Sequence, residues 1–487
     1  MNKNLLANII GKLTSALLML ISLPFLIKAI GTEGYAIIGV FTAIQSVLML
    51  LDGGVSAAYT KKTSELFSNR TKVCMIRNME LYFLSFFKIS IVVFFLSLAL
   101  FLYFSQFEVA NINQINMLMS ASLSVMFMQI FYQASMCSTG RQRSFNITLV
   151  MFGFIRYPLI AACVIIYELS ILSYFVLFLL ANIFYIIALH FQTTKTSYFS
   201  MLNSLIGNLG GKEEHRSNED EVFKRNMLLL VIMSSVFYQS DKLILAKFVN
   251  AEMLGAYSLA FTIASFPMVF TSAFYYYLFP KLVFLKDFSD KSVYQKETLK
   301  NTVFMMVGIS SVCIYLAFYS YEVLSIYLGN ELLAGEVGKI LFYLILGSLL
   351  QGILMIPYCA QLAIGKISYL VKLNAVFGIS MLVSQVLLAK YSTPNNVALS
   401  WLIYNCFVFC GIFKNLKFIS DIQRKWHWLL IGVIIPLTIV MATIILCESI
   451  LNSVTVNKLL VIIPSGFLSM FLKVIYTVFI LRKIDAK

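Results

Sequence analysis

The sequence has little charge for its length. Of its 487 residues, 12% are charged and 60% are hydrophobic, and the mean hydropathy is +0.87. A soluble domain carries about 25% charged residues, so this chain lacks the polar surface that a soluble core needs. Apolar runs of about 20 residues recur from end to end, and such runs predict membrane-spanning helices. Because the runs are continuous rather than alternating, a transmembrane barrel is excluded.

Histidine, paired cysteine and nucleotide-binding motifs are scarce or missing. The 3 histidines lie far apart, and the 8 cysteines stand singly, mostly inside apolar runs. A buried cysteine of this kind behaves as a small hydrophobic residue, so neither a disulfide framework nor a metal site is predicted. Gly365 and Lys366 lack the rest of a phosphate-binding loop, which excludes ATP-driven transport by this chain. No catalytic residue, metal or cofactor is assigned.

The apolar runs predict fourteen membrane-spanning helices. The first run, from Leu5 to Ile27, is too long for a signal peptide, contains Lys12 and precedes no cleavage site, so we expect it to be a retained span. The spans are expected near residues 6–29, 35–59, 80–104, 115–139, 145–166, 170–190, 226–249, 253–279, 302–328, 339–364, 367–389, 395–413, 427–447 and 457–481.

The 37 Lys and Arg residues are distributed unevenly between the loops. With fourteen spans, 27 of them fall on one side of the membrane, 5 on the other side and 5 within spans. Positive residues stay on the cytoplasmic side, so both termini are predicted to be cytoplasmic. The same rule accounts for the net charge of +15, and a nucleic-acid partner is therefore not predicted.

Two stretches of the first half recur in the second half. KAIGTEGYAIIGVFTAI, starting at Lys28, corresponds to KFVNAEMLGAYSLAFTI, starting at Lys247, at an offset of 219. Residues 138–153 correspond to residues 363–378 at an offset of 225. Their common order and near-equal spacing indicate a duplicated six-span unit, and the even number of spans makes the two copies parallel.

The duplication predicts the division into domains. We expect an all-α polytopic membrane protein with two parallel six-helix bundles and two extra C-terminal helices. Two such bundles enclose a cleft, and transporter binding sites lie at that repeat interface. The expected parts are an N-terminal lobe at 1–190, a cytoplasmic linker at 191–225, a C-terminal lobe at 226–415 and two additional spans at 416–487.

Short motifs mark the start of each half. The first half has the turn Ile30-Gly31-Thr32-Glu33-Gly34-Tyr35 and the span end Asp52-Gly53-Gly54, and the second half has SDKLILAKFVNAEMLGAYSLA. These motifs resemble the polysaccharide-exporter branch of the MATE-like multidrug/oligosaccharidyl-lipid/polysaccharide (MOP) superfamily. Ala36 departs from the glycine that is usual there, which leaves the first turn imperfect.

Within that superfamily, the sequence is most similar to the Wzx-type flippases. The resemblance implies V-shaped lobes that work by alternating access. It implies transport of undecaprenyl-diphosphate-linked oligosaccharides across the bacterial inner membrane for O-antigen, and hence lipopolysaccharide, or another surface polysaccharide. The expected partners are this lipid-linked oligosaccharide, membrane lipid, a polysaccharide polymerase and a chain-length regulator. No cofactor is expected. Transport is expected to be coupled to an ion gradient, of either H⁺ or Na⁺.

Charged residues within or near the spans form the candidate site. A charge at mid-bilayer costs roughly 2.5–3.5 kcal/mol, so it needs a partner, water or a substrate. Lys and Arg are ordinary phosphate ligands, and an acid among them can balance charge or bind the coupling ion. Lys88 and Lys473, near span ends, are instead expected to snorkel. The substrate-binding candidates are Lys12, Lys28, Lys242, Lys247 and Arg156, and the ion-coupling or counter-charge candidates are Asp52 and Asp241.

Several of these candidates have a simpler structural interpretation. Lys28 and Lys247 lie near the outer surface and can snorkel. Arg156 can bridge helices within the first lobe, and Asp52 can cap a broken helix end.

The adjacent charges Asp241 and Lys242 cannot easily satisfy each other. Neighbours on a helix point about 100° apart, so the two side chains face different surfaces. We expect one to face a wet cleft and the other a partner helix.

Two other classes of protein are considered. A MATE-type drug/cation antiporter shares the expected fold but should have a more acidic cavity, whereas this set is five basic against two acidic residues. A membrane-embedded polysaccharide polymerase or glycosyltransferase needs a long external loop with catalytic groups, and no external loop here has that length.

Overall fold

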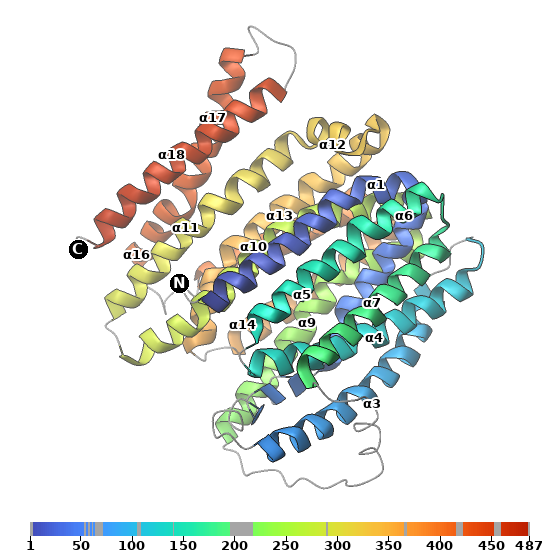
Figure 1. The fold of residues 1–487 in the computed structure, drawn as a ribbon. Coiled ribbons are helices and arrows are strands. Elements are labelled where there is room, and N and C mark those ends of the chain that lie inside the picture. The colour runs from blue at the N-terminus through green and yellow to red at the C-terminus, as the bar shows by residue number, and fades with distance from the viewer. Residues whose placement is uncertain are drawn as a thin grey trace. The chain divides into compact units, whose positions relative to one another are not determined.

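The computed structural model describes residues 3–52, 55–56, 59–60, 62–63, 72–104, 109–139, 141–194, 218–288, 291–364, 368–414, 422–451 and 459–485. Within these ranges every regular element is a helix (Figure 1). Twelve of the described helices are long and apolar enough to cross a membrane. The protein is therefore an all-α polytopic membrane protein, which confirms the predicted fold class.

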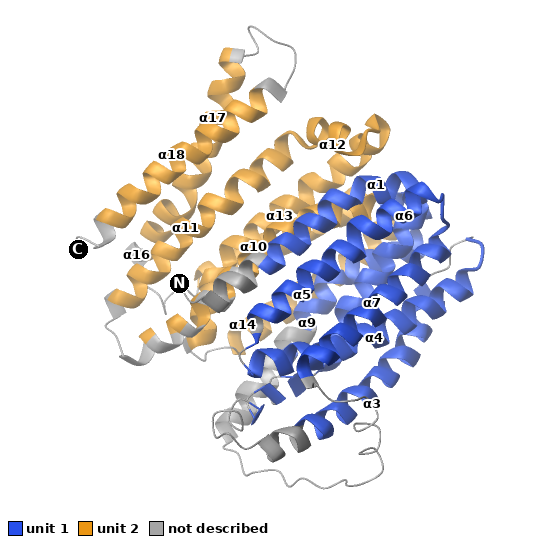
Figure 2. Ribbon diagram, in the orientation of Figure 1, with its two compact units in different colours: residues 1–255 blue, residues 256–487 orange. Residues whose placement is uncertain are grey.

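The chain divides into two compact units, residues 1–255 and residues 256–487 (Figure 2). Within the first unit, α4 packs against α3 and α7, and α1 packs against α5 and α9. The elements that begin in the first unit are α1 (Lys3–Leu48), η1 (Met49–Asp52), α3 (Lys72–Phe104), α4 (Ile112–Ser138), α5 (Gln142–Phe154), η2 (Ile155–Leu159), α6 (Ile160–Ile166), α7 (Ile171–Thr194), α9 (Asn218–Phe248) and α10 (Ala251–Phe288).

In the second unit, α13 packs against α11, α12 and α15, and α18 packs against α11 and α17. The predicted span at 302–328 is two elements, because Tyr319 leaves helical geometry with φ −116° and ψ 29°. The further elements are α11 (Lys291–Phe318), α12 (Ser320–Leu328), α13 (Glu331–Ile364), α14 (Ser368–Tyr391), α15 (Pro394–Lys414), α16 (Ile422–Leu429), η5 (Leu430–Ile434), α17 (Ile435–Leu451) and α18 (Leu459–Asp485).

Helix α1 consists of two helices joined at Gly31. Its 46 residues span about 69 Å at 1.5 Å per residue, more than twice the roughly 30 Å of the hydrocarbon core. Gly31 has φ 73° and ψ 174°, a backbone conformation that is essentially restricted to glycine. The turn predicted at residues 30–35 is thus a break at one residue. Counting α1 as two crossings and adding α9 to the twelve apolar helices accounts for the fourteen predicted spans.

The corresponding turn of the second copy also breaks the helix. Asn250 lies between α9 and α10, and its Oδ1 accepts a hydrogen bond from the backbone N–H of Met253 at 2.9 Å, as an N-cap does. Gly255 follows within two turns and lies directly against Thr32. A Cβ at Gly255 would be 2.0 Å from the Thr32 carbonyl oxygen, so only glycine allows this approach.

Helix α9 belongs to the first compact unit because it packs along α1. The internal repeat instead places residues 226–249 at the start of the predicted C-terminal lobe. The division by contacts therefore differs from the division by repeats at this one helix, and the lobes at 1–190 and 226–415 stay a prediction.

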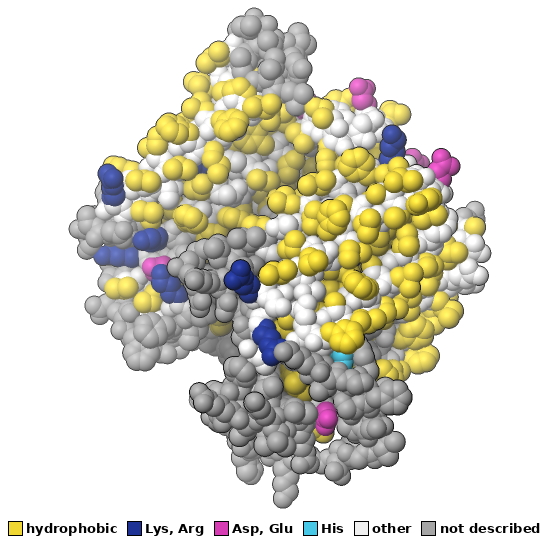
Figure 3. Space-filling view, viewed as in Figure 1, with side chains coloured by type: hydrophobic (Ala, Val, Ile, Leu, Met, Phe, Trp, Pro, Cys, Tyr) yellow, Lys and Arg dark blue, Asp and Glu magenta, His cyan; other side chains and the backbone are white. Residues whose placement is uncertain are grey.

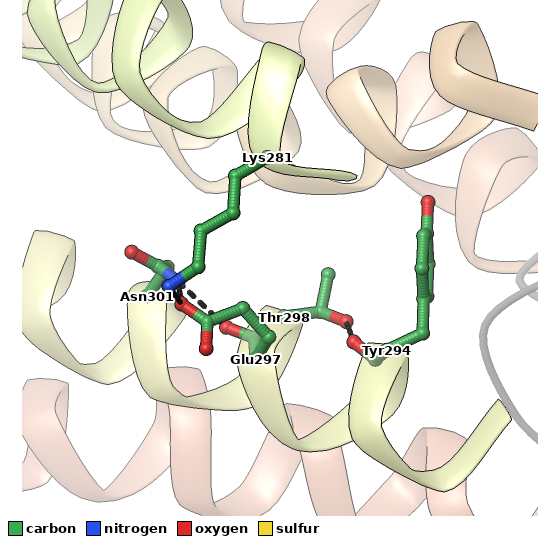
Figure 4. Close-up of polar contacts among 5 residues, drawn as sticks. All are labelled: Lys281, Tyr294, Glu297, Thr298 and Asn301. Atoms are coloured by element: carbon green, nitrogen blue, oxygen red, sulfur yellow. Dashed lines mark hydrogen bonds and ion pairs between the residues drawn. The ribbon is translucent and has the colours of Figure 1, made fainter. Parts of the chain in front are cut away.

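An ion pair joins α10 to α11 in the second unit. Lys281 on α10 reaches Glu297 on α11, whose carboxylate also accepts a hydrogen bond from Asn301 at 2.7 Å (Figure 4). On the same helix, the Tyr294 hydroxyl donates to the Ala360 carbonyl of α13 at 3.0 Å. These contacts tie three helices together at the end that the charge pattern assigns to the cytoplasm.

Hydrophobic side chains cover the outside of the helices. Figure 3 shows many hydrophobic side chains and few charged ones on the described residues of that face. Ile166 and Phe467 are 71% and 76% exposed, and Phe95 is 64% exposed. Large apolar side chains in such numbers would be unfavourable in water, so this surface is suited to lipid.

Candidate functional site

A row of polar side chains lies along the contact of α9 with α1. The Lys242 ammonium donates a hydrogen bond to Thr42 Oγ1 at 3.3 Å, and Gln239 Nε2 donates to Ser46 Oγ at 3.1 Å. Thr42 and Ser46 are four residues apart and Gln239 and Lys242 three apart, so each pair shares one helix face. Thr42, Ser46 and Gln239 are not among the residues predicted from the sequence. Their helical spacing within apolar runs is the signal that could have identified them.

Asp241 and Lys242 are both buried, and Lys242 belongs to this contact. Their exposed fractions are 1% and 2%. The Asp241 carboxylate accepts a hydrogen bond from the Lys242 backbone N–H at 2.7 Å, and it attracts the Lys242 ammonium electrostatically. Lys242 therefore points toward a partner helix, which is one of the two surfaces expected for this pair. The expectation that the other side chain faces a wet cleft is not met in this structure, because Asp241 is buried as well.

Lys12 and Lys28 lie at opposite ends of the first half of α1. Lys12 is half-buried and within electrostatic range of Cys137 on α4. Lys28 is exposed and lies three residues before the break at Gly31. Sixteen helical residues, about 24 Å, separate the two lysines, so the structure does not bring them together.

Lys247 is held at the end of α3. Its ammonium donates to the backbone carbonyl of Tyr103 and lies 3.7 Å from the centroid of the Tyr103 ring. A cation over an aromatic face is stabilised by the ring quadrupole. These contacts give Lys247 a structural role in joining α9 to α3, and its role in substrate binding stays a prediction.

Asp52 contacts Ser56. Its two carboxylate oxygens accept hydrogen bonds from the backbone N–H of Ser56 at 2.9 Å and from the Ser56 hydroxyl at 2.6 Å. An N-cap bond reaches the N–H two or three residues on and this one reaches four, so the capping interpretation stays a prediction. A role for Asp52 in ion coupling is not tested by these contacts.

Arg156 lies inside the helix bundle of the first unit. It is carried by the π-helical turn η2, and its guanidinium carbon is 4.4 Å from the ring centroid of Phe178 on α7. One of its terminal nitrogens contacts the sulfur of Met126 on α4 at 3.9 Å. Arg156 thus contacts two neighbouring helices, as the bridging interpretation expects.

The expectation that Lys473 snorkels is wrong. Lys473 is fully buried on α18, and its ammonium donates to the Val307 carbonyl at 2.7 Å and to the hydroxyls of Ser310 and Ser311 on α11. Three acceptors in one place satisfy all three ammonium donors. The side chain therefore has no need to reach the membrane surface.

The candidate residues form no metal centre in the part of the chain that the structure describes, since no three His, Cys, Asp or Glu side chains gather there. The chemistry on offer is that of lysine and arginine with hydroxyl and amide groups. Such a set binds anions and hydrogen-bonding groups.

The fold is shared with a class of membrane transporters. No protein-family model and no curated protein matches the sequence. Among solved structures, the lipid II flippase MurJ in an inward closed conformation is similar, with a TM-score of 0.67 and 14% identity over 99% of this chain and 99% of that chain.

Multidrug transporters have a similar fold as well. An inward-facing multidrug resistance MATE family transporter of the MOP superfamily has a TM-score of 0.64 and 11% identity, over 86% of this chain and 95% of that chain. The MATE multidrug transporter DinF-BH has a TM-score of 0.59 and 14% identity, over 86% of this chain and 95% of that chain. At these identities the likeness establishes the fold alone.

Proposed function

We propose that the protein is a flippase for lipid-linked oligosaccharides. It would move undecaprenyl-diphosphate-linked repeat units across the bacterial inner membrane for O-antigen or another surface polysaccharide, driven by a gradient of H⁺ or Na⁺. The observation that carries the proposal is the fold match to the lipid II flippase, which extends over 99% of both chains, whereas the two MATE transporters match 86% of this chain.

Lys242 is the residue that we assign to the diphosphate. The hydrogen bond that the Lys242 ammonium donates to the neutral Thr42 hydroxyl, at 3.3 Å, is weaker than one to a phosphate oxygen, where donor and acceptor are both charged. The ammonium is buried in the structure, so the phosphate would reach it only in a state in which α9 and α1 separate locally. Lys12, half-buried nearer the start of α1, is assigned to the same headgroup at another stage of its passage.

Asp241 balances the charge of Lys242 while the headgroup is absent. An uncompensated buried ammonium is unfavourable, and the adjacent carboxylate offsets it. When the diphosphate arrives, that carboxylate would repel it unless a proton or Na⁺ neutralises the acid. This requirement offers a physical route from ion binding at Asp241 to substrate binding at Lys242.

The test measures transfer of the glycan lipid across a membrane. The protein is reconstituted in vesicles that carry undecaprenyl-diphosphate-linked oligosaccharide, and an added glycosidase reports the glycan exposed outside. We expect the protein to render inner-leaflet glycan accessible, and Lys242→Ala to slow this by about tenfold or more, the loss of one hydrogen bond to a charged group. In cells, the same change should abolish surface polysaccharide while the protein stays in the membrane.

A matched control is Lys88→Ala, which removes an exposed lysine from the span formed by α3 and should leave transfer unchanged. Equal transfer by the wild type and Lys242→Ala would contradict the assignment of Lys242. A protein that protects cells from cationic drugs but exposes no glycan would contradict the flippase and favour a MATE-type drug/cation antiporter.

A further inference from the structure

Arg156 faces a small cavity inside the first unit. The cavity has a volume of about 100 Å³ and lies between α1, α4, α5, η2 and α7. Its lining combines an arginine with hydroxyl and amide groups among apolar side chains such as Phe145 and Leu149, and the cavity is partly open. The polar residues of the lining that matter here are Ser15, Gln129, Arg156, Tyr157 and Tyr185.

The cavity contains donors that lack acceptors. The Nε of Arg156 and the hydroxyl of Tyr185 are buried and have no hydrogen-bond partner among the described residues. The guanidinium is also paired with no carboxylate in the described ranges. Buried polar groups are normally satisfied, so two orphaned donors beside one cavity indicate that an acceptor binds there.

The surroundings of Arg156 stabilise the cation without neutralising it. The Phe178 and Tyr157 rings lie 4.4 Å and 5.5 Å from the guanidinium carbon. Aromatic faces attract a cation through their quadrupole, but they carry no net negative charge. The positive charge therefore remains available to an ion inside the cavity, and it excludes a cation from the same place.

The size of the cavity limits the ligand. A water molecule requires roughly 10–15 Å³ of a volume measured with a water-sized probe, so a space of about 100 Å³ holds one small ion with several waters. Pockets that enclose drug-sized ligands measure about 300–1,000 Å³, and a diphosphate with its sugars belongs with those larger ligands. The transported lipid that we propose is thus too large for this site.

We propose that this cavity is a binding site for a small monovalent anion of the halide class. The Arg156 guanidinium supplies the charge through Nε–H, and the Tyr185 hydroxyl donates a second hydrogen bond. An anion here would join α7 to η2, the π-helical turn that contains Pro158. The site is independent of which lipid the protein moves.

Thermal unfolding of the purified full-length protein tests the proposal. Chloride is titrated against gluconate at constant ionic strength, and we expect a saturable rise in Tm that bromide reproduces. Arg156→Gln should remove this rise. Tyr185→Phe, which keeps the ring and its packing on Phe152, should weaken chloride binding by about tenfold. Lys88→Gln, on the exposed face of α3, should keep the full rise.

A second measurement does not depend on the stability of a variant. Crystals of the wild type grown in bromide should show an anomalous peak within hydrogen-bond distance of Arg156 Nε and Tyr185 Oη. A Tm that responds equally to chloride and gluconate, or bromide-soaked crystals with only water in the cavity, would overturn the proposal. So would a chloride response that survives unchanged in Arg156→Gln.

Discussion

Single charged residues in this protein fall into two kinds, those with a full set of partners and those without. Lys473 is of the first kind, since three oxygen acceptors on α11 surround its ammonium. Arg156 is of the second kind, since its Nε has no partner among the described residues. The first kind is suited to holding helices together, and the second kind is suited to binding a ligand.

Lys473 gives a prediction about stability. Replacing a buried charge by an apolar residue of similar volume often leaves the protein equally stable or makes it more stable. Removing the partners of that charge leaves it buried without compensation and destabilises the protein. We therefore expect Lys473→Met to change the thermal stability little. Ser310→Ala combined with Ser311→Ala should lower the free energy of unfolding by about 1–3 kcal/mol, because two acceptors are lost.

The two variants are compared by thermal unfolding in the same detergent. Ser380→Ala combined with Ser384→Ala controls for the loss of two hydroxyl groups, because these serines donate to backbone carbonyls of their own helix, α14. A larger loss in Lys473→Met than in the Ser310 and Ser311 double variant would mean that the ammonium contributes net stability, against the expectation.

The residue types of the site are visible in the sequence, but their partners are not. Lys242 and Asp241 stand out because charge is rare in apolar runs. That Lys242 meets Thr42, 200 residues earlier, depends on the packing of α9 against α1. The prediction for Lys473 failed for the same reason, because the serines that hold it are 163 and 162 residues away. Partners at such separations leave no local pattern.

At the scale of helices, the sequence predicts where elements lie better than where they break or which neighbours they contact. Apolar runs locate the long helices, and the turn motif locates the break at Gly31. The short α12 was not predicted, because Tyr319 carries no signal of a helix end. The sequence also did not predict that α9 belongs to the first unit. The internal repeat shows which segments correspond to each other, whereas the division into units depends on which helices pack together.

The break in α1 gives a prediction at this scale. Gly31 adopts φ 73° and ψ 174°, although a Cβ there would meet no atom within 4 Å. The cost of Gly31→Ala is therefore one of backbone conformation alone, about 1–3 kcal/mol of unfolding free energy. Gly466 on α18 also has open space for a Cβ but no positive φ, so Gly466→Ala should be neutral or stabilising by up to about 1 kcal/mol.

Thermal unfolding of these two alanine variants separates conformation from packing. Similar Tm values for both would show that α1 can pass residue 31 in an ordinary helical geometry. In that case the two crossings of α1 would need another explanation.

For the whole molecule, the bias of basic residues predicts the orientation in the membrane. Fourteen crossings place 27 Lys and Arg residues on one side and 5 on the other, and an even number of crossings puts both termini on the same side. We expect a fluorescent protein fused after residue 487 to fluoresce, because it folds in the cytoplasm. Alkaline phosphatase fused at Gly329, which ends α12, should be active outside.

The same fusions can contradict this orientation. Phosphatase activity from a fusion after residue 487, together with inactivity at Gly329, would show that the chain is inserted the other way round. Activity at both positions would require an even number of crossings between them, whereas α13, α14, α15, α17 and α18 supply an odd number. With the chain inverted, the ion pair of Lys281 with Glu297 would lie at the outer surface. The basic residues around it would then be on the side that the charge rule disfavours, so the orientation and the rule would fail together.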